Sequence, residues 1–194
     1  MIKIIQQSVE ESIQAKQLFF NTNSTAIESC AHTLVTALKN GRKILLFGNG
    51  GSAADCQHIA AEFVNRFQME RNPLAAIALT CDTSILTSIG NDYSFEDIFS
   101  KQIQALGKKG DIALGITTSG NSPNVLRALE VAKERGITTV GLLGKGGGAM
   151  LDKVDIAIVV PEADTSDRIQ EVHIKVLHIA IEAVERMMFP ENYS

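Results

Sequence analysis

The sequence predicts an α/β fold: a mainly parallel five-stranded sheet with helices on both faces. Short apolar runs alternate with stretches of helical periodicity, the connections are short, and several runs end in glycine or hydroxyl residues directly before a helix. This alternation is typical of parallel sheets covered on both sides. With 194 residues, 45% hydrophobic composition and no repeat or linker, the chain is expected to form a single domain over residues 1–194.

The elements follow in order along the chain. Two N-terminal helices, an arm over about residues 1–40, are expected at 5–21 and 24–40, because their apolar positions recur every three or four residues. Asn23-Ser24 fits a helix start between them. Strands are expected near 43–47, 74–79, 111–116, 138–143 and 155–160. Further helices are expected over 52–67, 83–89, 94–106 and 123–135, with a long C-terminal helix over 166–188.

Cap chemistry supports two of these boundaries. Ser52 and Asp55 have the spacing of a capping box, with Asp in the acidic place. Ser122 precedes Pro123, which suits the first position of a helix. Both helices therefore begin directly after a polar loop.

Composition narrows the class of protein. A net charge of −4 and a pI of about 5.6 argue against non-specific binding to nucleic acid. Three cysteines without metal-ligand spacing indicate a reducing compartment. No apolar run approaches the roughly 20 residues of a membrane span. We therefore expect a cytoplasmic protein that binds neither nucleic acid nor membrane.

The segment Gly48-Asn49-Gly50-Gly51-Ser52 follows the first predicted strand and precedes a helix. Glycines let the backbone approach a ligand closely, and a helix N-terminus offers free N–H groups and the positive end of the helix dipole. The segment is therefore a candidate phosphate site, with Asn49, Gly50, Gly51 and Ser52 as its ligand-binding residues. The alternative is a glycine-rich turn that serves only the topology.

A second segment of this kind, Thr117-Thr118-Ser119-Gly120-Asn121-Ser122, follows the third predicted strand. Its four hydroxyl groups exceed what one helix cap needs. The residues predicted to bind a ligand are Thr117, Thr118, Ser119, Asn121 and Ser122. Two such loops at the ends of strands in one sheet predict a phosphorylated ligand.

Two other segments leave alternatives open. Asn91 and Asp92 could bind sugar hydroxyls near the carboxyl end of the sheet, or they mark a turn. The glycine-rich stretch 144–148 also follows a strand, and ligand contact and a mobile connection fit it equally well.

The helix after the first loop carries His58 and Glu62, which lie about 40° apart around the helix axis, with Arg66 on the same side. Their neighbours are apolar, and burying a carboxylate is costly unless it is paired, metal-bound or used in chemistry. The alternative is an i,i+4 pair on a solvated surface.

On the C-terminal helix, Asp167, Gln170 and His178 fall within about 80° of the helical wheel. His173 falls on another face, so it and His32 are predicted to have structural or surface roles. If the two polar helices face one another, they supply a set of N and O ligands that suits zinc or a similar divalent ion, and equally acid–base chemistry. The set consists of His58, Glu62, Gln170 and His178.

At these residues the chain resembles the sugar isomerase (SIS) domain family and, within it, the bacterial phosphoheptose isomerases. The matching segments are GNGGSAADCQH (48–58), the continuation from Glu62 to Arg66, IGNDYSFEDIFSKQ (89–102), TTSGNSPNV (117–125) and DRIQEVHIKVLHI (167–179). The resemblance covers essentially the whole chain, and its QEVHIKVLH block is far more specific than the glycine loop.

The resemblance implies aldose–ketose isomerisation of sedoheptulose 7-phosphate to D-glycero-D-manno-heptose 7-phosphate, the first step towards the heptose of lipopolysaccharide. It implies Glu62 and His178 as the acid–base pair, and homotetramers with active sites at subunit interfaces. It also implies one zinc ion held by His58, Glu62, Gln170 and His178. Phosphate and sugar contacts would come from Ser52, Thr117, Thr118, Ser119 and Ser122, with Asn91, Asp92, Arg66 and Asp167 around the site.

The alternative function comes from the same family. A related SIS protein binds the replication initiator DnaA and has no known isomerase activity. That relative lacks a carboxylate at the position of Glu62 and a histidine at the position of His178, and this chain has both. Ala53-Ala54 and the C-terminal Phe-Pro-Glu-Asn-Tyr resemble the DnaA-binding relative, so a protein partner of this type, or sensing of sugar phosphates, is the second hypothesis.

Overall fold

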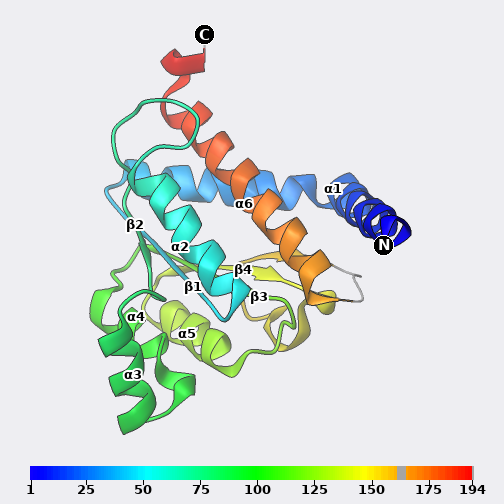
Figure 1. Cartoon of the computed structure of the whole chain (residues 1–194). Coiled ribbons are helices and arrows are strands. Elements are labelled where there is room, and N and C mark those ends of the chain that lie inside the picture. The colour runs from blue at the N-terminus through cyan, green and yellow to red at the C-terminus, as the bar shows by residue number, and fades with distance from the viewer. Residues whose placement is uncertain (161–164, 194) are drawn as a thin grey trace.

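The computed structural model describes residues 1–160 and 165–193 of the chain. At its centre is a five-stranded sheet in which every neighbouring pair of strands is parallel, in the order β2-β1-β3-β4-β5 (Figure 1). The strands are β1 (Ile44–Gly48), β2 (Ala76–Ala78), β3 (Ile112–Thr117), β4 (Thr138–Leu143) and β5 (Ile156–Val159). The predicted fold class and the five predicted strands are confirmed.

Two hydrophobic cores lie on the two faces of this sheet, because successive side chains of a strand point to opposite sides. In β1, Ile44 and Leu46 belong to one core, whereas Leu45 and Phe47 belong to the other. Every residue of β1 is buried, as expected for a central strand of a parallel sheet. Burial on both faces explains why the strands read as short, nearly continuous apolar runs.

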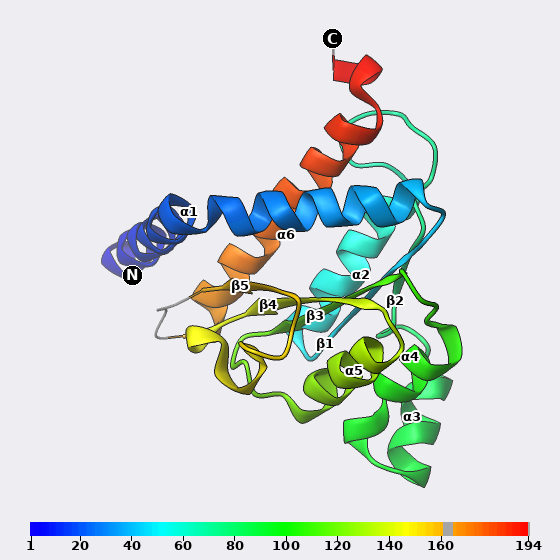
Figure 2. The ribbon, with the colours of Figure 1, turned by 180° about the vertical axis from the view of Figure 1, so that it is seen from behind.

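Helices cover both faces of the sheet (Figures 1 and 2). One face carries α1 (Ile2–Lys39), α2 (Gly51–Val64) and α6 (Ser166–Met188), and the other carries α4 (Ser100–Leu106) and α5 (Pro123–Glu134), with α3 (Thr83–Asp92) beside them. Short 3-10 helices occupy Phe95–Asp97, Lys145–Met150 and Pro190–Tyr193. The two helices predicted to carry chemistry, α2 and α6, therefore share a face and contact each other.

The two predicted N-terminal helices are one continuous helix, α1, so that part of the prediction is wrong. Asn23 and Ser24 do not start a new helix, because their side chains donate to carbonyls of the preceding turn. Asn23 Nδ2 donates to Phe19 O (3.0 Å), and Ser24 Oγ donates to Phe20 O (2.9 Å). Such bonding satisfies polar side chains within a helix and often bends it, and α1 bends between its N-terminal part and the rest (Figures 1 and 2).

A 3-10 turn followed by α4 replaces the single helix predicted over 94–106. Ser94 Oγ caps the turn by accepting a hydrogen bond from Glu96 N (3.1 Å), and Ser100 Oγ donates to Asp97 O (3.2 Å). These local bonds between hydroxyls and backbone compete with a continuous helix.

Across the described residues, no helix combines the length and the apolar character that crossing a membrane requires.

Asp111 ties the N-terminal ends of β1 and β3 together. Its carboxylate is buried, accepts hydrogen bonds from Lys43 N (3.1 Å) and Lys108 N (2.8 Å), and pairs with the Lys43 ammonium. Burial alone would raise the pKa of Asp111, but the hydrogen bonds from Lys43 and Lys108 outweigh it and lower the pKa. The charged carboxylate is therefore the form that the fold stabilises.

We expect Asp111→Asn to lower the free energy of unfolding by about 1–3 kcal/mol near neutral pH. Because the folded pKa of Asp111 lies below its unfolded value, the native carboxylate stabilises the fold above the unfolded pKa and loses this effect as the pH falls through the folded pKa. The difference between the variant and the wild type should therefore shrink as the pH falls below the unfolded pKa, about 4. Urea denaturation at a series of pH values measures it, and a difference independent of pH would contradict the prediction.

Candidate active site

The order of the strands places the two predicted ligand loops next to each other. β1 and β3 are neighbours, with Gly48 opposite Ile116, and β2 pairs with the other edge of β1. In open parallel sheets, ligands bind beyond the carboxyl ends of the strands at the point where the strand order reverses. The loop 48–52 follows β1 and the loop 117–122 follows β3, so both loops lie at this switch point.

The first loop turns sharply into α2. Gly50 is the residue that caps α2, and its φ of 58° lies in the left-handed region that favours glycine. The cap position therefore belongs to Gly50, whereas Ser52 is buried within the first turn of the helix. A glycine at this position leaves the N–H groups at the start of α2 uncovered by a capping side chain.

A reciprocal pair of amides joins the first loop to the helix that follows the second. Asn49 Nδ2 donates to Asn124 Oδ1, and Asn124 Nδ2 donates to Asn49 Oδ1, both at 2.9 Å. Asn124 is 2% exposed. Asn124 could not be predicted as part of the site, because one polar residue in the first turn of a helix gives no periodic signal. This pair fixes the two loops relative to each other.

In the second loop the hydroxyl groups interact with one another. Thr117 Oγ1 lies 2.9 Å from Ser122 Oγ and 3.3 Å from Ser119 Oγ. Ser119 Oγ accepts a hydrogen bond from Asn121 N (3.1 Å), and Thr118 is half-buried beside it. Four of the five residues predicted to bind a ligand in this loop, all except Thr118, are thus joined by hydrogen bonds in one compact turn.

The glycine-rich stretch after β4 supports the second loop. A Cβ atom on Gly120 would lie 2.3 Å from Gly147 O, so the two backbones touch where no side chain would fit. Asn121 Oδ1 also accepts a hydrogen bond from Ala149 N (2.9 Å). The glycines of this stretch therefore permit a close backbone approach to the loop.

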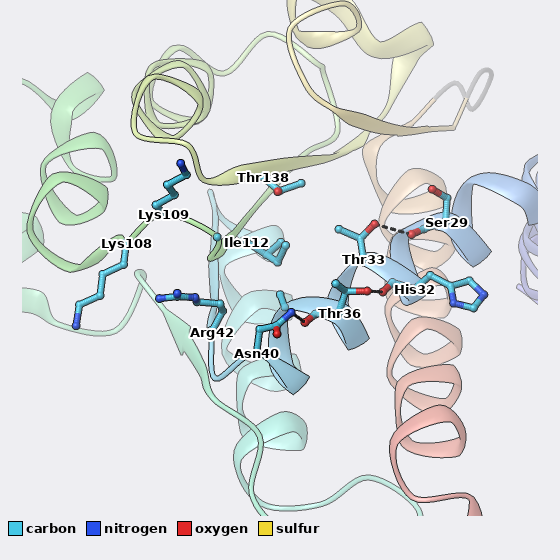
Figure 3. A pocket seen from close by; sticks show the side chains of 12 residues that line it. Ser29, His32, Thr33, Thr36, Asn40, Arg42, Lys108, Lys109, Ile112 and Thr138 are labelled. Carbon is cyan, nitrogen blue, oxygen red and sulfur yellow. Dashed lines mark hydrogen bonds between the residues drawn. The ribbon is translucent and has the colours of Figure 1, made fainter.

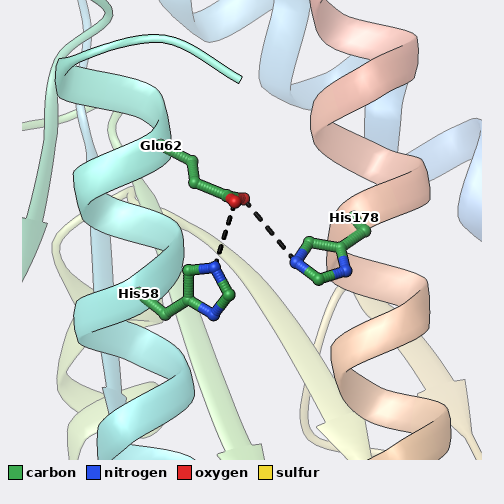
Figure 4. Close-up of side chains that lie close together, drawn as sticks. All are labelled: His58, Glu62 and His178. Atoms are coloured by element: carbon green, nitrogen blue, oxygen red, sulfur yellow. Dashed lines mark hydrogen bonds and ion pairs between the residues drawn. The ribbon is translucent and has the colours of Figure 1, made fainter. Parts of the chain in front are cut away.

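His58, Glu62 and His178 come together between α2 and α6 (Figure 4). Glu62 Oε1 lies 3.0 Å from His58 Nε2, and Glu62 Oε2 lies 3.8 Å from His178 Nε2. The two imidazole rings meet edge to face with their centroids 5.2 Å apart. The Glu62 side chain is 18% exposed, against 49% for His58 and 30% for His178, so the imidazoles are more open to solvent than the carboxylate between them.

These three side chains could hold a metal ion, since their ligand atoms all lie within 4.8 Å of one another. A tetrahedral zinc site holds neighbouring N and O ligands about 3.3 Å apart, and 3.0 and 3.8 Å separate Glu62 from its two histidines. Glu62 Oε2 is buried and has no hydrogen-bond partner among the described residues. A carboxylate oxygen in that situation requires a cation or a proton, so the donor set fits a divalent metal such as zinc.

Asp55, predicted from the sequence only as a helix-capping residue, is a further carboxylate at this site. It precedes His58 by three residues and Glu62 by seven, which places all three on one face of α2. Its Oδ2 is buried without a hydrogen-bond partner among the residues that the structure describes. Burial raises the pKa of Asp55, whereas the charges of His58 and His178 lower it. The i, i+3, i+7 spacing was the signal that could have identified it.

On α6, Gln170 and His173 have different surroundings, in agreement with the helical wheel. The Gln170 amide lies against the first loop, because a Cβ atom on Gly51 would meet Gln170 Nε2 at 2.4 Å. His173 is fully buried, and burial lowers its pKa to about 4. His173 is therefore a neutral core residue, whereas His32 is exposed on α1.

Four predicted site residues interact with partners outside the Glu62 group: Arg66, Asn91, Asp92 and Asp167. Since α2 ends at Val64, Arg66 leaves the helix, and it pairs with Glu70 at 2.9 Å. Asn91 and Asp92 lie exposed in the last turn of α3 and hydrogen-bond to each other (2.8 Å). The shared helical face predicted for Arg66 is therefore wrong.

Asp167 lies in the exposed first turn of α6. A hydrogen bond with Thr165 holds the pKa of its carboxyl below the usual range, and the neighbouring Arg168, 3.5 Å away, acts in the same direction. Asp167 is one turn before Gln170 on α6, so it lies towards the loops rather than towards His178.

A cavity of about 840 Å³ lies at the opposite end of the sheet, between the C-terminal part of α1 and the N-terminal ends of β3 and β4 (Figure 3). The lysines that line it, Lys108 and Lys109, point in different directions (Figure 3). The hydroxyls of Thr33 and Thr36 donate to carbonyls of α1 itself, each at 2.8 Å. The two lysines and the two threonine hydroxyls therefore do not converge on one point of the cavity.

Comparisons with known proteins identify the family of the chain. Residues 9–144 match the SIS domain family. The phosphoheptose isomerase of Thermodesulfovibrio yellowstonii is 51% identical over 185 residues, which cover 95% of this chain and 92% of the relative.

Two solved structures are similar in both sequence and shape. The phosphoheptose isomerase from Francisella tularensis superposes with a TM-score of 0.91 at 41% identity, over 95% of this chain and 98% of that one. The phosphoheptose isomerase from Neisseria gonorrhoeae gives a TM-score of 0.87 at 45% identity, over 94% of this chain and 97% of that one. The likeness therefore extends over nearly the full length of each protein.

Proposed function

The chain belongs to the phosphoheptose isomerase family of SIS-domain enzymes, and from this premise we propose that it converts sedoheptulose 7-phosphate to D-glycero-D-manno-heptose 7-phosphate in the cytoplasm. The observation that carries the proposal is the pair formed by Glu62 and His178. Their carboxylate and imidazole come from two different helices and lie 3.8 Å apart. They lie on the face of the sheet covered by α2 and α6, and two loops of phosphate-binding composition lead to this part of the molecule.

In the proposed reaction Glu62 is the general base and His178 the general acid. Glu62 removes a proton from C1 of the ketose, the electrons of that C–H bond form the C1–C2 double bond, and His178 donates a proton to the C2 oxygen. The resulting cis-enediol returns its O1 proton to His178 and takes a proton at C2 from Glu62, which leaves an aldehyde at C1. C1 is oxidised as C2 is reduced, so no external redox cofactor is needed.

We assign the phosphate of the substrate to the second loop, with Thr117, Thr118, Ser119 and Ser122 as donors. Asn121, Asn49, Ser52 and the backbone of Gly50-Gly51 complete this end of the site. The support is the ordered hydroxyl cluster and its link to the first loop through Asn49 and Asn124. We assign the sugar hydroxyls to Gln170, Asp167, Arg66, Asn91 and Asp92. Of these, Arg66, Asn91 and Asp92 would come into contact with the Glu62 group only when the subunits assemble.

We further propose that each subunit holds one zinc ion through His58, Glu62 and His178, with Gln170 as the fourth ligand. When bound, zinc supplies positive charge beside the oxygens of the substrate. His58→Ala should weaken zinc binding at least about 100-fold, since even the loss of an outer partner costs 10- to 100-fold. Isothermal titration of metal-stripped protein measures the affinity, with His32→Ala, on α1, as the matched control. Unchanged affinity in the His58 variant would reject this ligand set.

The N-terminal arm supports assembly into a homotetramer. Its N-terminal part projects from the body of the subunit (Figures 1 and 2), and the arm carries Ile2, Ile5, Val9 and Leu18, each more than half exposed. Large apolar side chains clustered on a surface mark contact sites. Light scattering should give the mass of four chains, and Ile5→Glu with Val9→Glu should reduce it; a monomeric wild type at micromolar concentration would contradict the assignment.

Incubating the purified protein with sedoheptulose 7-phosphate and detecting the aldose tests the function directly. The competing hypothesis, a protein that binds a DnaA-type partner or senses sugar phosphates, predicts binding of the ketose without conversion. Glu62 and His178 favour the enzyme, because a binding protein has no use for a base next to an acid. Binding without aldose formation, with zinc present, would favour the alternative.

A further inference from the structure

A buried ion pair lies behind the Glu62–His178 pair and contacts neither the substrate loops nor solvent. Arg71 Nε lies 2.8 Å from Glu185 Oε1, and the two side chains are 0% and 1% exposed. Arg71 belongs to the segment after α2, and Glu185 lies on α6, seven residues beyond His178. A spacing of seven residues places Glu185 on the same side of α6 as His178, two turns away.

Arg71 holds the end of α2. Its Nη2 donates to Glu62 O (2.7 Å) and its Nη1 to Phe63 O (2.8 Å). These carbonyls lie in the last turn of α2, where no further turn of the helix can donate to them. A positive charge at the C-terminus of a helix also interacts favourably with the helix dipole. The guanidinium thus binds the backbone of the residue that we assign as the base.

Glu185 reaches the acid through Phe67. Its carboxylate accepts hydrogen bonds from Phe67 N (3.0 Å), Gln68 N (3.1 Å) and the hydroxyl of Tyr193 (2.9 Å). The ring of Phe67 stacks on the imidazole of His178, with centroids 5.6 Å apart and planes 19° from parallel. The position of the Phe67 backbone therefore sets the surface against which the His178 ring lies.

We propose that Arg71 and Glu185 are positioning residues that hold Glu62 and His178 in register across the gap between α2 and α6. The inference rests on the proposed function of those two residues. The attraction between the two charges is not in itself a reason for the pair, because a buried ion pair loses so much hydration that apolar residues of similar volume often stabilise a fold equally well or better. Directional hydrogen bonds to Glu62 O and Phe67 N provide what an apolar pair cannot, a fixed placement of both chemical groups.

The decisive experiment compares Glu185→Gln with the double variant Arg71→Met/Glu185→Leu. Breaking the pair should destabilise the fold, whereas the apolar double variant should recover part of the free energy of unfolding, the remainder being lost because the carbonyls of Glu62 and Phe63 and the N–H groups of Phe67 and Gln68 no longer have these partners. We expect kcat to be about 10- to 100-fold below wild type in both, with KM within about twofold, since small misplacements of reacting groups cost that much. A double variant that recovers stability and kcat together would show that the pair is only structural, and would overturn the proposal.

Two further variants keep the test independent of folding. Arg71→Lys keeps a cation beside Glu185 but has a single nitrogen in place of the planar fork that also reaches Glu62 O and Phe63 O, so its kcat should fall even at temperatures well below its melting temperature. Tyr193→Phe removes one hydrogen bond to the same carboxylate and leaves the ion pair, so its kcat should stay within about twofold. Wild-type kcat in the lysine variant would contradict the assignment.

The ring protons of His178 give a readout without turnover. They experience the ring current of Phe67, and His32, exposed on α1, serves as an internal reference. The double variant should shift the His178 resonances and leave those of His32 in place; an unchanged His178 spectrum would reject the positioning role. A wild-type protein without isomerase activity would instead reject the proposed function, and the spectra would still test the positioning.

Discussion

Glu62→Gln is expected to lower the turnover of sedoheptulose 7-phosphate by about 10²–10⁴-fold, the usual effect of losing a positioned general base. Gln has nearly the shape of Glu, but it cannot accept the proton from C1. Apart from its backbone, Glu62 interacts with His58 and His178 rather than with the core, so the variant should fold normally. Steady-state kinetics and circular dichroism of the same preparation measure both properties.

The matched control is Glu130→Gln. Glu130 is an exposed carboxylate on α5 that pairs with Lys153 at 2.7 Å, on the other side of the sheet. The same chemical change at that position should leave kcat unaffected. Turnover near wild type in the Glu62 variant, or an equal loss in both variants, would remove Glu62 from its assigned role.

Gly120→Ala should both destabilise the protein and impair binding of the sugar phosphate. Gly120 has a φ of +68°, which costs a non-glycine residue about 1–2 kcal/mol. Its new Cβ would also lie 2.3 Å from Gly147 O, a backbone atom that cannot move without shifting the supporting stretch. Adding about 1–3 kcal/mol for this overpacking, we expect a loss of about 2–5 kcal/mol in the free energy of unfolding and a higher KM.

Gly41→Ala separates the two contributions. Gly41 has the same φ of +68°, but an added Cβ would meet nothing within 4 Å. The substitution should therefore lower the free energy of unfolding only by the cost of the left-handed backbone conformation. It should leave KM unchanged, since Gly41 follows α1 at the other end of the sheet. Urea denaturation and kinetics on both variants measure the difference. Equal destabilisation of the two variants would show that the close contact between Gly120 and Gly147 does not affect the free energy of unfolding.

The strands were predictable because burial on both faces leaves a direct trace in the sequence. Ile44 to Phe47 are apolar without alternation, since each face of the sheet has its own core. The N-terminal helix was misjudged for an equally physical reason. Asn23 and Ser24 can cap a new helix or bond back to the turn before them, and local sequence does not decide between these choices.

The site divides in the same way between local and long-range information. The two loops were identified because their glycines and hydroxyls are contiguous, and the grouping of His58 with Glu62 because they share one helix. Contacts that join distant segments could not be read from spacing, as for Asn49 with Asn124, 75 residues later. Asp55 was missed because a capping spacing explained it adequately until the structure placed its carboxylate near both histidines.

The split of the proposed acid–base pair between α2 and α6 affects how the protein matures during synthesis. Glu62 leaves the ribosome early, but its partner follows 116 residues later, from 62 to 178, on the last long helix. Because chains fold from the N-terminus as they emerge, a nascent chain can already build much of its sheet while it has no partner for its base. Catalytic competence is thus among the last properties to be acquired, and a message cut short before α6 would encode an inert protein.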